Sequence, residues 1–154
     1  MGNKIMLKES DINIAVISNF TVEPILGKNL NSIFSRAMCK VNLQSISYDE
    51  YSTEENLNII HYSDRIIVWL NIDCFYPDLI NDLISKKVST EEIVNDAKIK
   101  FLNLYSTLRH NSQVPILWMG VEDYCYYHYN HSFGNLLICE GVIDRVNFEV
   151  IFNS

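Results

Sequence analysis

The residues with the clearest chemical potential follow a short apolar run near the start of the chain. Residues 12–17 are apolar apart from Asn13, and the polar turn Ser18-Asn19-Phe20-Thr21 comes directly after them. Pro24 and a helical repeat of apolar residues then predict a helix. Open α/β sheets bind ligands where a strand delivers such a loop to a helix N-terminus, because unpaired N–H groups converge there. A hydroxyl in this turn could act as a nucleophile if a histidine lay within hydrogen-bond reach.

Further polar residues follow two later apolar runs. They are Asn71 and Asp73 after the third predicted strand, and Glu122 and Asp123 after the fourth. Because the carboxyl ends of parallel strands meet at one edge of a sheet, we expect these residues to share a ligand cleft with the first turn. For Asp123, capping of the following turn is an equally good interpretation.

Two histidines lie in the aromatic and polar segment that follows the fourth strand. His128 and His131 are three residues apart with carboxylates nearby, a spacing that can bind zinc on a helical turn. A loop rich in tyrosine and histidine is more often a packed surface, because amphipathic rings bury their bodies and keep their polar tips hydrated. We therefore expect neither a metal nor a cofactor. We place His128 among the candidate cleft residues, and either His128 or His131 could be the base for Ser18.

The elements that must position these residues alternate between strands and helices. Apolar and β-branched runs predict strands at 12–17, 41–47, 64–70 and 114–119, of which the second is the most exposed and therefore nearest an edge. Ser89-Thr90-Glu91-Glu92 reads as a capping box that opens a long helix. Such alternation implies right-handed crossovers, so we expect an α/β fold with three layers and a doubly wound, mainly parallel sheet.

Helical spacing also predicts which side chains face the core. In the first helix these are Leu26, Leu30, Ile33, Phe34 and Ala37, and in the long helix Val94, Ala97, Phe101, Leu104, Tyr105 and Leu108. A short helix is expected at 77–84, a turn at Gly120, and an imperfect helix from 136 to 152. The chain stops where this fold would supply its next strand, so we expect the sheet to lack its last strand and helix.

Composition limits the partners that this chain can have. Its 154 residues fit one domain, and 12 basic against 19 acidic residues give a net charge of −7, which repels nucleic acid and anionic membranes. No apolar run is long enough to span a bilayer, and the N-terminus lacks a signal-peptide core. The four cysteines are scattered without a C-x-x-C pair, so we interpret them as reduced thiols of a cytoplasmic protein.

Three segments resemble the N-terminal region of FkbH-like proteins of the HAD superfamily. These segments are 14–21, 68–73 and 115–124, within a resemblance that covers roughly 12–152. In that family an SGNH-hydrolase-like domain precedes a phosphatase-type domain that loads glycerate-derived units onto acyl carrier proteins. The resemblance implies a single SGNH-hydrolase or flavodoxin-like domain at 1–154, as the N-terminal part of a longer protein. The implied partners are the rest of that HAD-containing polypeptide or a carrier protein.

The resemblance also implies which catalytic residues are missing. HAD phosphatases need a D-x-D-x-[TV] loop, and Asn71-Ile72-Asp73, the nearest approach, lacks the first carboxylate. SGNH esterases carry G-D-S after the first strand, and Ser18, Asn19 and Phe20 stand at those three positions here. A phenyl ring cannot attack an acyl carbon. Asn71 alone of the oxyanion-hole residues is retained, and the late D-x-x-H that supplies the base is absent.

Three classes of function remain open after this comparison. The favoured one is a non-catalytic accessory or docking domain that uses the cleft residues Ser18, Asn19, Thr21, Asn71, Asp73, Glu122, Asp123 and His128. The alternative is an SGNH or GDSL-type acyl-ester hydrolase with Ser18 as nucleophile. A third is a structural domain that only packs against the remainder of a longer polypeptide.

Overall fold

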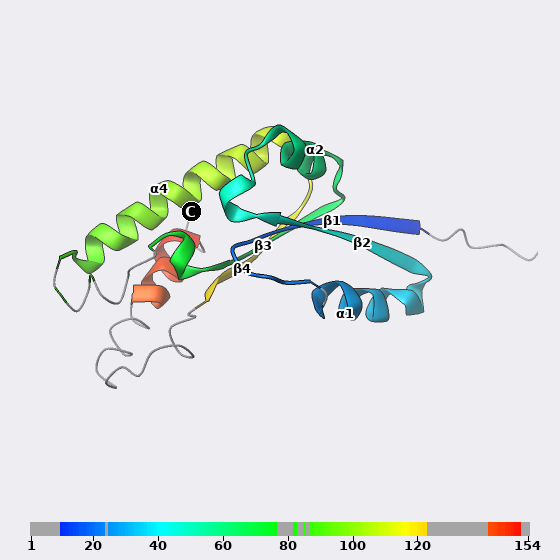
Figure 1. The fold of residues 1–154 in the computed structure, drawn as a ribbon, viewed down its shortest axis with the longest axis horizontal. Coiled ribbons are helices and arrows are strands. Elements are labelled where there is room, and N and C mark those ends of the chain that lie inside the picture. The colour runs from blue at the N-terminus through cyan, green and yellow to red at the C-terminus, as the bar shows by residue number, and fades with distance from the viewer. Residues whose placement is uncertain are drawn as a thin grey trace, which may run out of the picture.

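A four-stranded parallel sheet organises the chain. The structure, a computed structural model, describes residues 10–23, 25–76, 82, 85, 87–122 and 142–151. The strands are β1 (Ser10–Ser18), β2 (Cys39–Ser47), β3 (Arg65–Asn71) and β4 (Ile116–Glu122), in the order β2-β1-β3-β4. Helix α1 (Ile25–Phe34) lies on one face of the sheet, and α2 (Glu54–Tyr62) and α4 (Thr90–Asn111) lie on the other (Figure 1). The predicted doubly wound α/β architecture is confirmed.

Short helical turns follow several of these elements. They are η1 (Ser35–Ala37) after α1, η2 (Tyr48–Glu50) after β2, η3 (Ile72–Cys74) after β3, and the π-helical segment η4 (Val146–Ile151). The segment η4 packs against α4 and β4. It therefore belongs to the layer of α2 and α4.

Alternating side chains of the strands build a core on each face of the sheet. The core on the α1 side contains the buried residues Ile14, Val16, Val22, Val41 and Ile67. The larger core on the other side includes Ile17, Ile66, Val68, Ala97, Phe101, Leu104 and Leu108. Burial on both faces explains why the central strands read as continuous apolar runs in the sequence.

Two helices present their faces differently from the prediction. In α1, Leu26, Leu30 and Phe34 pack toward the sheet, whereas Ile33 is 64% exposed. Ile33 is wrong as a core residue because α1 packs on the sheet through Leu30, Asn31 and Phe34, and this orientation turns Ile33 to solvent. Ala37 is also exposed, since α1 ends at Phe34 and the chain tightens into η1. In α4, Tyr105 is 40% exposed at the rim of the core.

Gly120 forms a β-bulge where a turn was expected. Val68 pairs with Trp118 and Leu70 pairs with Val121, so β4 carries one more residue than β3 across this interval. Gly120 has a φ of 84°, a conformation that glycine adopts without steric cost. A Cβ at this position would also lie 3.1 Å from Oδ1 of Asn147. The bulge lets β4 continue to Glu122, three residues beyond the predicted end of the strand.

Asn31 attaches α1 to the edge strand β2. The Val41 N–H donates to Asn31 Oδ1 at 2.9 Å, and Asn31 Nδ2 donates to the Val41 carbonyl at 3.0 Å. The same Nδ2 donates to the Gly27 carbonyl within α1 at 3.0 Å. This amide satisfies backbone groups on the outer side of β2 and fixes the rotation of α1 about its own axis.

Several predictions fall on residues outside the described ranges. They concern Pro24, the short helix at 77–84, and the segment that contains Asp123, His128 and His131. Among the described cysteines, Cys39 is buried and Cys74 is half-buried. Within the described ranges, no helix combines the length and apolar character needed to cross a membrane.

The predicted capping box at the start of α4 is confirmed. Glu92 N–H donates to Ser89 Oγ at 3.3 Å, and Ser89 N–H donates to Glu92 Oε2 at 2.7 Å. The hydrogen bond from the Ser89 backbone, with a second from its hydroxyl, lowers the pKa of Glu92. This stabilisation is present above the unfolded-state pKa and is lost as the pH falls through the folded-state pKa.

We expect Ser89→Ala to lower the free energy of unfolding by about 1 kcal/mol, because the first turn of α4 loses a side-chain acceptor. Urea denaturation at neutral pH measures the loss. Ser106→Ala, an exposed substitution in the middle of the same helix, is the matched control and should leave stability unchanged or slightly raised. Equal losses in the two variants would contradict the capping role.

Candidate functional site

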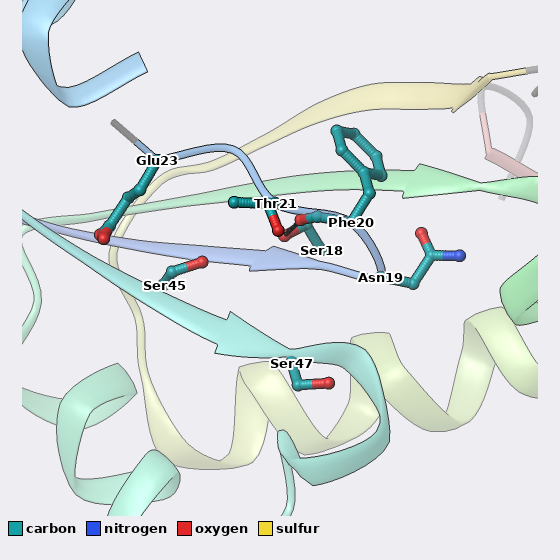
Figure 2. A pocket seen from close by; sticks show the side chains of 7 residues that line it. All are labelled: Ser18, Asn19, Phe20, Thr21, Glu23, Ser45 and Ser47. Atoms are coloured by element: carbon teal, nitrogen blue, oxygen red, sulfur yellow. Dashed lines mark hydrogen bonds between the residues drawn. The ribbon is translucent and has the colours of Figure 1, made fainter. Parts of the chain in front are cut away.

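An open polar groove of about 350 Å³ lies at the carboxyl edge of β1 and β2. Figure 2 shows its lining, which consists of Ser18, Asn19, Phe20, Thr21, Glu23, Ser45 and Ser47. The parallel register places Ser18 beside Ser47, and this brings hydroxyl groups of both strands to the same edge. Glu23 adds an exposed carboxylate. The groove can therefore hydrogen-bond an uncharged polar ligand, whereas its charge disfavours an anion.

Ser18 has its hydroxyl committed to the backbone of its own turn. The residue is 3% exposed, and Ser18 Oγ donates to the Phe20 carbonyl oxygen at 2.8 Å. The seven residues that line the groove include no histidine, lysine or arginine. Because a serine nucleophile needs an adjacent base to accept its proton, this lining does not activate Ser18.

Asn19 joins the ends of β1 and β3. Asn71 N–H donates to Asn19 Oδ1 at 2.7 Å, and Asn19 Nδ2 donates to the Asn71 carbonyl at 3.4 Å. The strand order reverses between β1 and β3, and open α/β sheets bind ligands in the crevice at such a point. The amide of Asn19 thus occupies the position where a ligand would otherwise meet the backbone of β3.

Phe20 turns its ring away from the polar groove. Its ring packs edge-on against Trp69 on β3, with centroids 5.4 Å apart and planes at 86°. Figure 2 shows the ring on the opposite side of the turn from Ser45 and Ser47. The residue at the expected nucleophile position is therefore part of the core between the sheet and α1.

A smaller apolar cavity of about 200 Å³ lies beside this aromatic pair. It is lined by Phe20, Thr21, Val22, Ile25, Leu26, Asn29 and Trp69. The indole Nε1 of Trp69 is buried and has no conventional hydrogen-bond partner in the described part of the chain. The Trp69 ring instead makes a perpendicular aromatic contact with the Phe20 ring.

Five of the other predicted cleft residues lie at the carboxyl edge of the sheet, where Asn19 also lies. Ser18 and Thr21 line the groove, and the Asn71 backbone binds Asn19. Asp73 lies in η3 directly after β3, and Glu122 is the last residue of β4, in register with Asn71. The structure thus brings these backbone positions to one edge of the sheet.

The sequence analysis did not predict three of the residues that line the groove. Ser45 and Ser47 alternate at the end of β2 and therefore point to one face, a period-two signal that the sequence carries. Only the register with β1 reveals that they lie beside Ser18. Glu23 follows the turn and lines the groove at the point where the chain leads into α1.

Among the described side chains, neither Tyr48 nor a metal site adds a reactive group. Burial raises the pKa of Tyr48, with smaller contributions from Cys74 and Tyr51, so its phenol stays protonated at neutral pH. Within the described ranges, no cluster of three histidine, cysteine or acidic residues could hold a metal ion.

No family model and no curated protein matches this chain. Among solved structures, it is similar to the N-terminal part of the protein BF1531 from Bacteroides fragilis, described as containing a phosphatase domain complexed with Mg. The TM-score is 0.55 at 9% sequence identity, and the similarity covers 91% of this chain and 36% of that chain. At this identity the similarity shows a shared fold.

We expect Asn19→Ala to lower the free energy of unfolding by about 1–3 kcal/mol, because the buried backbone of Asn71 loses the hydrogen bonds that Asn19 supplies. Chemical denaturation measures the loss. Asn103→Ala, an exposed asparagine on α4, is the matched control and should not destabilise the protein. An Asn19→Ala variant as stable as the wild type would show that the bridge contributes nothing.

Proposed function

We propose that this chain is a non-catalytic accessory and docking domain of an FkbH-type protein, which assists the loading of glycerate-derived units onto an acyl carrier protein. The observation that carries the proposal is the turn after β1. Ser18 closes the turn, Asn19 bridges to β3, and Phe20 packs on Trp69. Each of these three side chains has a structural partner, and none of the three is activated as a nucleophile by a described residue, which favours a binding role over a catalytic one.

The similarity to a solved structure supports the same proposal. That structure is the N-terminal part of a protein with a phosphatase domain, and the similarity covers 36% of its chain. The phosphatase domain in the description of that structure is compatible with the FkbH resemblance, in which a phosphatase-type domain follows the SGNH-like domain. In the proposed protein, the D-x-D-x-[TV] domain performs the phosphoryl chemistry, and this domain contributes recognition.

A hydrolase is the second candidate, because Ser18 is a serine that lines an open groove at the carboxyl edge. Under our proposal, a fluorophosphonate probe does not label the protein and short-chain chromogenic esters are not turned over. Intact-protein mass spectrometry and absorbance measure these two results. Labelling or turnover that disappears in Ser18→Ala would replace the docking function with the hydrolase.

We also expect the chain to bind a phosphopantetheine-bearing acyl carrier protein without any other domain. Changes in the backbone amide spectrum of the isotopically labelled chain, measured by NMR during titration, report this binding. Serum albumin, an acidic protein of unrelated structure, is the control and should cause no specific shifts. A carrier protein that leaves the spectrum unchanged would contradict the proposed function.

A further inference from the structure

The outward side of α1 and of η1, the turn that follows it, carries exposed apolar and basic side chains. The α1 surface is defined here as Ile25, Lys28, Ile33, Arg36 and Met38, all of which are exposed. Ile25 is 72% exposed, Ile33 64% and Met38 51%. Three large, exposed apolar side chains within fourteen residues of the chain are a candidate contact surface.

The packing of α1 fixes which side chains point outward. Leu26, Leu30 and Phe34 contact the core, and Asn31 makes two hydrogen bonds to the backbone of Val41. Figure 1 shows α1 beside β1 and β2, on the face of the sheet opposite α2 and α4. This packing directs Ile25, Lys28 and Ile33 to solvent.

The charge of this region differs from that of the whole chain. Residues 25–38 contain Lys28 and Arg36 and no acidic residue, whereas the chain has a net charge of −7. In the described part of the structure, the ion pairs involve neither Lys28 nor Arg36. Both cations are thus available to an acidic partner, and residues 25–38 add no like-charge repulsion against it.

Met38 is held in a conformation that its side chain does not favour. It caps η1 with a φ of 52°, in the left-handed region where glycine or asparagine is usual. Its exposed side chain stands beside a hollow of about 290 Å³ that Asn31, Ser35, Cys39 and Lys40 also line. A bulky, exposed methionine at a glycine position costs stability, and a contact with a partner would explain its presence.

We propose that the α1 surface is the docking site for an acidic partner protein that presents exposed apolar side chains. In the proposed function this partner is the acyl carrier protein, so the inference rests on that function and identifies where the two proteins meet. Lys28 and Arg36 face the acidic groups of the partner. Ile25, Ile33 and Met38 supply the apolar contact.

The test compares charge-reversal variants on the two helical layers. Lys28→Glu/Arg36→Glu should raise the Kd for a phosphopantetheine-bearing acyl carrier protein about tenfold or more at low salt. Added salt should weaken wild-type binding and reduce the difference between the proteins. Lys98→Glu, an exposed reversal on α4, is the control and should bind within about twofold of the wild type. Calorimetric titration measures each affinity.

Two apolar variants separate docking from folding. Ile33→Gln changes an exposed side chain and should weaken binding without lowering Tm. Met38→Gly relieves the left-handed strain, so it should raise Tm while it weakens binding. If Met38 had a structural role alone, Met38→Gly would not raise Tm and weaken binding at the same time.

The outcomes distinguish this inference from the proposed function. Reduced binding in the α1 variants with retained binding in Lys98→Glu supports both. Wild-type affinity in Lys28→Glu/Arg36→Glu overturns the α1 surface as the docking site and leaves the proposed function standing. A wild-type chain that does not bind the carrier protein overturns both.

Discussion

The hydrogen bonds between the Asn19 side chain and the Asn71 backbone are the interaction on which the functional edge depends. The pairing of β1 with β3 ends at Ser18 and Trp69, whereas β3 continues to Asn71, and backbone groups left unpaired there cost free energy if they are buried. In many open α/β sheets a ligand or loop meets these groups at the point where the strand order reverses. Here the amide of Asn19 binds both groups of Asn71. In the turn that this bridge holds, the Ser18 hydroxyl donates to the Phe20 carbonyl oxygen. The Phe20 ring packs against the core on the α1 side of the sheet.

Asn31 provides the same kind of contact at the outer edge of the sheet. Its amide binds the Val41 backbone and thereby locks α1 against β2. The chain thus covers exposed backbone groups with its own asparagine side chains at two places. Two described surfaces that stay open to a partner are the hydroxyl-lined groove at the carboxyl edge and the outward face of α1. The first suits an uncharged polar group, and we propose the second as the contact for an acidic protein.

Local patterns predicted most elements correctly, whereas features that depend on neighbouring elements were missed. The strands and the capping box at Ser89 rest on periodicity and on contacts within four residues, which a sequence displays directly. Ile33 fits a helical repeat equally well inside or outside, and only the packing of α1 on β2 turns it to solvent. Gly120 signals a backbone with positive φ, but a turn and a bulge share that requirement. Pairing with β3 selects the bulge.

The sequence by itself determined the alternation of strands and helices, the net negative charge, and the absence of a G-D-S turn after the first strand. Each of these depends only on residue identity and short-range spacing. Tertiary structure alone decided what the side chains of that turn do. The approach of β3 to β1 provides the backbone that Asn19 binds, and Trp69 provides the surface on which Phe20 packs. The partners of both residues lie about fifty positions away in the chain, so no local pattern could encode these contacts.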